Sequence, residues 1–195
     1  RWGMLPDAVS HAVKEWAVVI EAIRTGKQVF LLRKGGLIEP DAPEFERPSG
    51  PFVLAPTFKK QKADLIRAES AREFSGFLDG SDDSHQVEIT TLVEVTENIV
   101  LKNPIQAHRL WDNHVWRADH LTERINTRPE VPLHLLFVRA HALKTPVKID
   151  RPEHFSNRKA WIEFGKNITI GETKSVLQDP EYRRETRIVR ELLQA

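Results

Sequence analysis

The sequence contains no cysteine. This absence excludes disulfide bonds, zinc sites built on thiolates and cysteine nucleophiles, and it favours a protein of a reducing compartment. The sequence also has no run approaching the ~20 apolar residues that a membrane-spanning helix needs, and residues 1–15 lack the apolar core of a secretory signal. We therefore expect a cytoplasmic protein without a membrane partner.

The chain also has little excess of either charge. Its 29 Lys and Arg residues against 28 Asp and Glu residues give a formal net charge of +1, and hydrophobic residues make up 40% of the chain, as in ordinary globular proteins. A polyanionic partner would therefore have to be bound by local clusters of cations. Two such clusters occur, and they are Arg24, Lys27, Arg33 and Lys34, and Lys59, Lys60, Lys62 and Arg67.

Apolar spacing predicts the elements of the N-terminal half. Residues 11–23 carry apolar side chains every three or four positions, which predicts a helix. The β-branched residues within this segment leave open a strand over residues 16–23, followed by a hairpin turn. Short buried strands are expected at residues 28–33 and 52–55, and a helix at residues 59–74.

The clearest strand signal lies further along the chain. Residues 87–95 alternate apolar and polar side chains, which is typical of a half-buried strand. Asn103 and the proline after it suit the start of a helix, and this helix would carry Trp111 on its buried face. Trp116 falls outside that face, so we expect its ring to be available to a ligand.

Two more strands are expected at residues 133–138 and 160–164, and a charged amphipathic helix at residues 180–194. Strands and helices interleave without the regular spacing of a doubly wound sheet, which favours an α+β fold with a small mixed sheet or barrel and peripheral helices. We expect residues 1–164 to form a single domain, with residues 165–195 as a C-terminal helical extension packed on it.

Specific motifs are spread over most of the chain, and they are residues 14–22 (KEWAVVIEA), 31–36 (LLRKGG), 52–58 (FVLAPTF) with Gln61, 132–139 (PLHLLFVR), Pro146 and 161–163 (WIE). Together they resemble a bacterial family described as domain of unknown function 1802. Lys60 stands where such proteins tend to have histidine, so this chain offers no imidazole at that position. The resemblance implies no particular activity.

A second resemblance concerns the fold. Gly26 and Arg33 have the spacing of the Gly-x-Lys-x-x-Glu-x-Arg signature of ASCH proteins, which belong to the PUA-like β-barrels, although Gln28 and Leu31 replace the lysine and the glutamate. This resemblance implies a PUA-like barrel that binds RNA or modified nucleobases, and in some members a small amidohydrolase reaction.

Two segments combine the groups that bind nucleic acid. The first offers a guanidinium and an ammonium group beside two glycines, whose backbone a phosphate can approach closely. The second offers an aromatic ring, two ammonium groups and an amide, which suit base stacking and phosphate binding. With the tryptophan considered above, the candidate residues for binding RNA or single-stranded DNA are Arg33, Lys34, Gly35, Gly36, Thr57, Phe58, Lys59, Lys60, Gln61 and Trp116.

Two other functions remain open. Glu21 or Glu39, acting with Lys34, could serve a hydrolase or nuclease, with or without Mg²⁺. The C-terminal helix could instead dock on a partner protein, and homo-oligomers are also open. The histidines of residues 108–120 are six positions apart, which prevents them from converging on one metal, so we expect no metal site and no cofactor.

Overall fold

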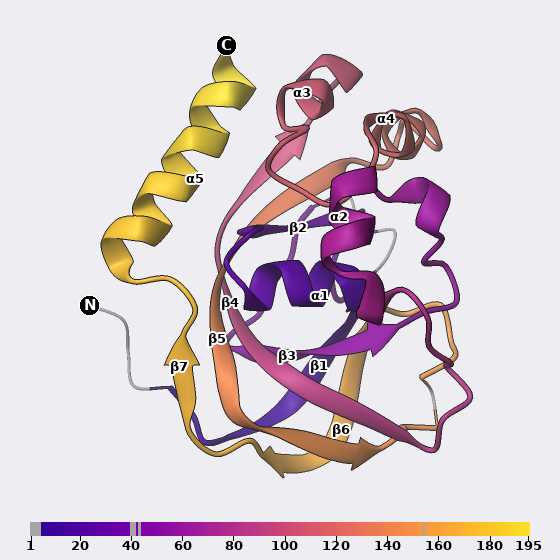
Figure 1. Cartoon of the computed structure of the whole chain (residues 1–195), viewed down its shortest axis with the longest axis vertical. Helices are drawn as coiled ribbons and strands as arrows, with labels where there is room; N and C mark the ends of the chain where they lie inside the picture. Colours follow the sequence, from indigo (N-terminus) through magenta and orange to yellow (C-terminus); the bar gives the residue numbers. More distant parts are fainter. Residues whose placement is uncertain (1–4, 40–41, 43, 154) are drawn as a thin grey trace.

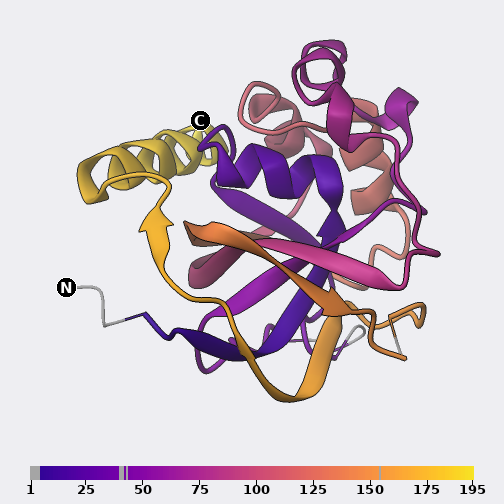
Figure 2. The same ribbon diagram turned by 60° about the horizontal axis from the view of Figure 1, so that its bottom comes forward.

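The computed structural model describes residues 5–39, 42, 44–153 and 155–195. It is an α+β fold built on a mixed seven-stranded sheet in the order β2-β5-β4-β3-β1-β6, with β7 paired to β5 (Figure 1). The helices gather on one side of the curled sheet (Figure 2). The predicted fold class is confirmed, including the C-terminal amphipathic helix.

The elements in chain order are β1 (Ala8–Trp16), α1 (Ala17–Arg24), β2 (Phe30–Lys34), β3 (Phe52–Thr57), η1 (Ala63–Leu65), α2 (Ala68–Glu73), η2 (Ser75–Phe77), β4 (Gln86–Leu101), α3 (Pro104–Arg109), α4 (Ala118–Asn126), β5 (Leu133–Asp150), β6 (Trp161–Thr169), β7 (Thr173–Ser175) and α5 (Asp179–Gln194).

The long antiparallel strands β4 and β5 form the spine of the sheet. The strand predicted over residues 87–95 is confirmed, with Val87 and Ile89 buried and Glu88 exposed. The predicted alternation ends at the first register shift, since Leu92 and Val93 are both fully buried. Two register shifts interrupt the β4–β5 pairing, and such bulges bend strands. The described part of the chain has two hydrophobic clusters. One lies toward α1 and the other helices. The second lies among β1, β3, β6, the first half of β4 and the second half of β5.

The expectation of a helix over residues 11–23 is wrong for its first half, and the alternative strand over residues 16–23 is wrong as well. β1 pairs with β3 on one side and β6 on the other, so its backbone is hydrogen-bonded within the sheet. Ala12 and Val13 are both buried, because the strand has hydrophobic clusters on both faces. Because apolar residues are buried on both faces of this strand, their positions in the sequence resemble the apolar spacing of a helix. The helix begins only at Ala17, where the Gln61 side chain accepts the N–H of Val18 at 2.8 Å.

The single helix expected after Asn103 is in fact two short helices, α3 and α4. The segment between them pairs with the chain before α2 through a β-bridge between Ile66 and Trp116. This pairing buries Trp116, which is 1% exposed, and leaves Trp111 on the surface at 54% exposed. The sequence prediction had the two tryptophans the wrong way round, because it continued one helical face through a chain that turns.

The helix expected over residues 59–74 is also largely replaced by other structure. After β3 the chain forms η1, and only Ala68–Glu73 is α-helical. β3 itself continues through Pro56 to Thr57. The missing N–H of this proline costs no ladder bond to β4, since β3 pairs with β4 only at Phe52 and Val53.

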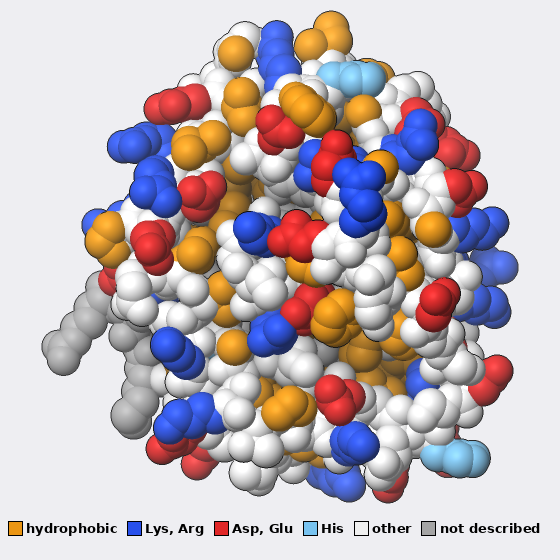
Figure 3. All heavy atoms as spheres, in the orientation of Figure 1, with side chains coloured by type: hydrophobic (Ala, Val, Ile, Leu, Met, Phe, Trp, Pro, Cys, Tyr) orange, Lys and Arg blue, Asp and Glu red, His pale blue; other side chains and the backbone are white. Residues whose placement is uncertain are grey.

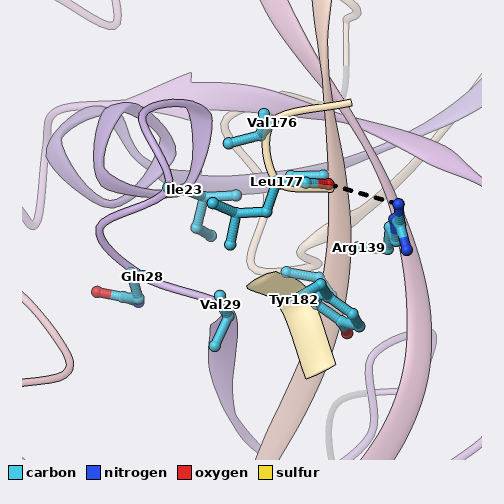
Figure 4. Close-up of a pocket in the computed structure, with 10 residues that line it drawn as sticks. Ile23, Gln28, Val29, Arg139, Val176, Leu177 and Tyr182 are labelled. Atoms are coloured by element: carbon cyan, nitrogen blue, oxygen red, sulfur yellow. Dashed lines mark hydrogen bonds between the residues drawn. The ribbon is translucent and has the colours of Figure 1, made fainter. Parts of the chain in front are cut away.

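The C-terminal segments pack on the same core as the rest of the chain. β6 borders β1, and α5 contributes Tyr182, Val189 and Leu193 to the cluster around α1. Where the chain enters α5, Arg139 pairs with Asp179. A cavity of about 10 Å³, which is room for one water molecule, is lined by Arg139, Leu177 and Tyr182 among others. Figure 4 shows these side chains around it. The division of the chain at residue 164 stays a prediction.

Candidate nucleic-acid interface

A buried ion pair lies where β1 ends. Arg33 Nη2 is 2.9 Å from Glu15 Oε2, and the two side chains are 14% and 4% exposed. The same Arg33 nitrogen donates to the carbonyl of Lys14 at 2.7 Å. In the parallel register Trp16 lies opposite Thr57, whose hydroxyl donates to the Glu15 carbonyl at 3.3 Å. Arg33 and Thr57, which come from the two predicted binding segments, therefore meet at Glu15.

On one side of this pair, the positive charge continues through Lys14 to Lys60. Lys14 Nζ donates to the carbonyls of Phe155 and Asn157 at 2.8 and 2.6 Å, which fixes the ammonium group. The pKa of Lys14 is lowered, first by burial and then by the charge of Lys60, while Asp82 acts in the opposite direction. Lys14 therefore interacts electrostatically with both Lys60 and Arg33.

On the other side, the charge continues through Arg124 to Lys34. The pKa of Arg124 is lowered to about 10, by burial first and then by the charge of Arg33, so the group remains protonated at neutral pH. Lys34 Nζ donates to the carbonyl of Ile125 at 3.1 Å. The pKa of Lys34 is lowered by burial and then by Arg124, with a further contribution from Arg128.

Each of these cations interacts electrostatically with at least one other, and we call the group the basic track; its members are Lys60, Lys14, Arg33, Arg124, Lys34 and Arg128. The carboxylates of Glu15, Asp82 and Glu130 offset it only in part. On the face shown in Figure 3, side chains of both charges are mixed. The basic track is thus a local concentration of charge in a protein whose net charge is close to zero.

An aromatic pair stands beside the basic track. The rings of Trp16 and His120 are stacked, with centroids 5.4 Å apart and planes at 27°. Both residues are partly exposed. The pKa of His120 is lowered by burial and by Arg124, so the imidazole is neutral at pH 7. A neutral, partly exposed ring pair beside cations is suited to stacking a nucleobase.

The double glycine and Trp116 do not belong to this surface. Gly35, at φ 79°, and Gly36 are both buried, and the Gly35 N–H donates to the carbonyl of Pro132 at 2.8 Å. A Cβ on Gly36 would come within 2.4 Å of the Glu39 carbonyl oxygen, so close packing within the chain accounts for this glycine. The buried Trp116 offers no surface on which a base could stack.

The second predicted segment is divided between surface and core. Lys59 is exposed, and Phe58 is partly exposed. Their backbone N–H groups donate to the carboxylate of Asp82 at 3.0 Å from Phe58 and 2.9 Å from Lys59, which holds this loop in place. Gln61 is 8% exposed, and its amide oxygen is used by Val18 at the start of α1. Gln61 is therefore a positioning residue for that helix.

The three residues considered for catalysis are not brought together by the described contacts. The buried Glu21 accepts two hydrogen bonds from Arg24, at 2.7 and 2.5 Å. Glu39 is exposed and lies 3.7 Å from Lys159. Lys34 points to the end of α4. Each acidic group is thus occupied by a different cation from the one that the prediction assigned to it.

Sequence reasoning missed Lys14, Trp16, His120 and Arg124 as members of the site. Recognising residues 8–16 as a strand would have placed Lys14 and Trp16 at its end, close to the next parallel strand. No local signal could have found His120 and Arg124, because only the packing of α4 against the end of β2 brings them to this position.

Over the described residues, no group of three or more His, Asp or Glu side chains is arranged to hold a metal ion. Nor is any helix in the described ranges both long and apolar enough to cross a membrane.

Comparisons with known proteins add a family assignment. A search of curated proteins finds no match. Among solved structures, the crystal structure of a mutant of the ZmASCH protein from Zymomonas mobilis matches at 11% identity with a TM-score of 0.44, over 94% of this chain and 99% of the other. The family model of DUF1802, a domain of unknown function, matches residues 12–187. The predicted resemblance is confirmed, and the chain belongs to the DUF1802 family.

Proposed function

We propose that this protein binds single-stranded nucleic acid, with phosphates along the basic track and a base on the Trp16–His120 pair. The observation that supports the proposal is that Arg33 and Lys60, from two separate basic clusters of the sequence, both interact electrostatically with Lys14, while Arg33 also interacts with Arg124.

The electrostatic state of the track supports a polyanionic ligand. Three of its cations, Lys14, Lys34 and Arg124, have lowered pKa values because burial and like charges disfavour their protonated forms. A phosphate placed beside them would favour those protonated forms and relieve the repulsion. Phosphate contacts to Lys and Arg supply most of the affinity in sequence-independent binding.

The aromatic pair favours single strands over duplexes. A base can stack on the rings of Trp16 and His120 only if its own faces are free, and in a duplex they are covered by neighbouring bases. Stacking on an aromatic side chain contributes about 1–3 kcal/mol per base. RNA and single-stranded DNA remain equal candidates for the ligand.

The proposal is tested by fluorescence anisotropy of labelled single-stranded RNA, single-stranded DNA and duplex DNA, over a series of salt concentrations. If all six cations contact phosphates, the slope of log K against log salt should be about −4, since each contact contributes about −0.7 on a single strand. Raising the salt from 50 to 200 mM would then weaken binding on the order of 300-fold.

Paired variants separate the track from the remaining surface. Lys60 and Arg128 lie at its two ends and are exposed, so the double variant Lys60→Gln, Arg128→Gln should reduce the slope by about 1.4. The matched control removes two exposed lysines outside the track, as Lys148→Gln, Lys174→Gln, and should leave the slope unchanged. His120→Ala should weaken single-strand binding without altering the slope. Absent binding, or equal losses in both double variants, would overturn the proposal.

A further inference from the structure

A second group of polar side chains lies away from the basic track, at an irregularity between β1 and β6. The two strands run side by side at the bottom of Figure 2, and their register shifts between Val9 and His11. Val9 pairs with Ile168, whereas His11 pairs with Glu163. Residues 164–167 of β6 therefore bulge outward opposite Ser10.

At the bulge, a hydroxyl, an imidazole and a carboxylate lie next to one another. Ser10 Oγ is 2.9 Å from His11 Nδ1, and His11 Nε2 is 3.8 Å from Glu163 Oε1. The imidazole stacks on the indole of Trp161, with ring centroids 4.9 Å apart and planes at 27°, which holds its orientation. A proton on Nε2, facing the carboxylate, leaves Nδ1 free to accept the proton of Ser10.

These side chains face a space large enough for a small substrate. The pocket is a depression wide open to solvent, with a volume of about 390 Å³, and it is lined by Ser10, His11, Glu163, Gly165, Lys166 and Asn167. Gly165 has φ 69°, a left-handed conformation within the bulge. Lys166, which follows this glycine, also lines the pocket and can bring a positive charge to a developing oxyanion.

We propose that Ser10, His11 and Glu163 form a Ser–His–carboxylate site that hydrolyses small esters by acyl transfer. Ser10 Oγ attacks the ester carbonyl carbon, and its proton passes to His11 Nδ1. The tetrahedral oxyanion lies toward the bulge and Lys166. The bond from carbon to the alcohol oxygen breaks, and the alcohol leaves with the proton from His11. Water then repeats the sequence on the acyl-serine, releases the carboxylic acid and restores Ser10.

A second Ser–His–Glu group in the protein has a similar arrangement but is closed to substrate. Ser175 Oγ is 3.4 Å from His141 Nδ1, and His141 Nε2 is 3.5 Å from Glu94 Oε2. His141 is only 3% exposed, so no ester carbonyl can reach this group. The side chain of His11 is 38% exposed, and it opens into the pocket.

The test uses the full chain and two probes, hydrolysis of p-nitrophenyl acetate and covalent labelling by a fluorophosphonate, with the labelled peptide located by mass spectrometry. We expect one label per chain, on Ser10, and we expect Ser10→Ala to lose both the labelling and at least 10-fold in turnover. His11→Gln should slow both reactions to a similar extent, and Glu163→Gln should slow them less, because this carboxylate only orients the ring.

The chain contains its own matched control. Its sequence has two Ser–His dipeptides, and in the second the Ser84 hydroxyl accepts the N–H of Gln86 at 3.3 Å. Ser84→Ala should therefore leave labelling and turnover unchanged. Label on Ser84 or on lysines, no label at all, or equal turnover of wild type and Ser10→Ala would overturn the proposal. Thermal melting confirms that each variant is folded, and the outcome is independent of nucleic-acid binding.

Discussion

The substitution Glu15→Gln tests the centre of the basic track, and it should lower stability without weakening binding. Glutamine keeps the size of the side chain, and its oxygen can still accept the Trp16 N–H, which Glu15 Oε1 accepts at 2.8 Å. What the variant loses is the negative charge 2.9 Å from Arg33. The charges of Arg33 and Arg124 would then repel each other without the carboxylate that offsets both.

The size of the effect follows from burial. Removing one partner of a buried ion pair costs about 3–5 kcal/mol, because the other charge is left unpaired. Arg33 is still 14% exposed and keeps its hydrogen bond to the Lys14 carbonyl, so we expect the lower end of this range, about 3 kcal/mol. For a domain of this size, that loss lowers Tm by roughly 6–12 °C.

Two measurements on the Glu15→Gln variant test the expected changes in stability and affinity. Urea unfolding followed by circular dichroism gives the free energy of unfolding, and fluorescence anisotropy gives the affinity for a single strand. Affinity should stay equal or increase, since the site gains net positive charge. The exposed residue Glu88 supplies the control, and Glu88→Gln should change stability by less than about 0.5 kcal/mol. A loss below about 1 kcal/mol in Glu15→Gln, or weaker binding, would refute this account of the site.

Three further predictions follow from single residues. Trp116→Ala should lower the free energy of unfolding by about 3–5 kcal/mol, because this ring is buried. Trp111→Ala should change it by less than about 1 kcal/mol in the same urea unfolding experiment. Similar losses in both variants would contradict the burial of Trp116. Burial lowers the pKa of His114 to about 3, below its unfolded value, so its neutral form stabilises the protein above pH 6.5 and this contribution declines as the pH falls toward 3. Wild type should therefore lose about 2 kcal/mol between pH 7 and pH 5 from this group, and His114→Gln should lack that part of the slope in urea unfolding at the two pH values. Asp82→Asn should tighten single-strand binding about twofold in anisotropy titrations, because it removes a negative charge near Lys14 and beside Lys59; weaker binding would mean that the loop conformation matters more than the charge.

Some features of the fold could be predicted because local chemistry determines them. The alternation at residues 87–89 is typical of a strand, and the structure has that strand. Leu92 and Val93 are both buried, because hydrophobic clusters cover both faces there. Asn103 is the N-cap of α3, and its side chain accepts the Gln106 N–H at 3.2 Å. The charged helix near the C-terminus also forms, one residue earlier than expected, with Gln178 at its N-cap.

Other features were wrong because burial on two faces looks like helical spacing. Residues 11–16 lie in a strand between two neighbours, with hydrophobic clusters above and below, so apolar side chains occur at adjacent positions. The same difficulty applies to Trp111 and Trp116, whose burial depends on a β-bridge to Ile66, far earlier in the chain. No pattern within a window of the sequence contains that information.

The sequence by itself determined the α+β class, the family and the presence of two basic clusters, since composition, alternation and motifs are local properties. Only the tertiary structure decided which charges act together. Arg33 pairs with Glu15 because β1 runs parallel to β3 and ends beside β2, and Arg124 joins them because α4 packs against that end. Electrostatic interactions depend on distance in space, and the distance between these groups is set by the folding of the whole chain.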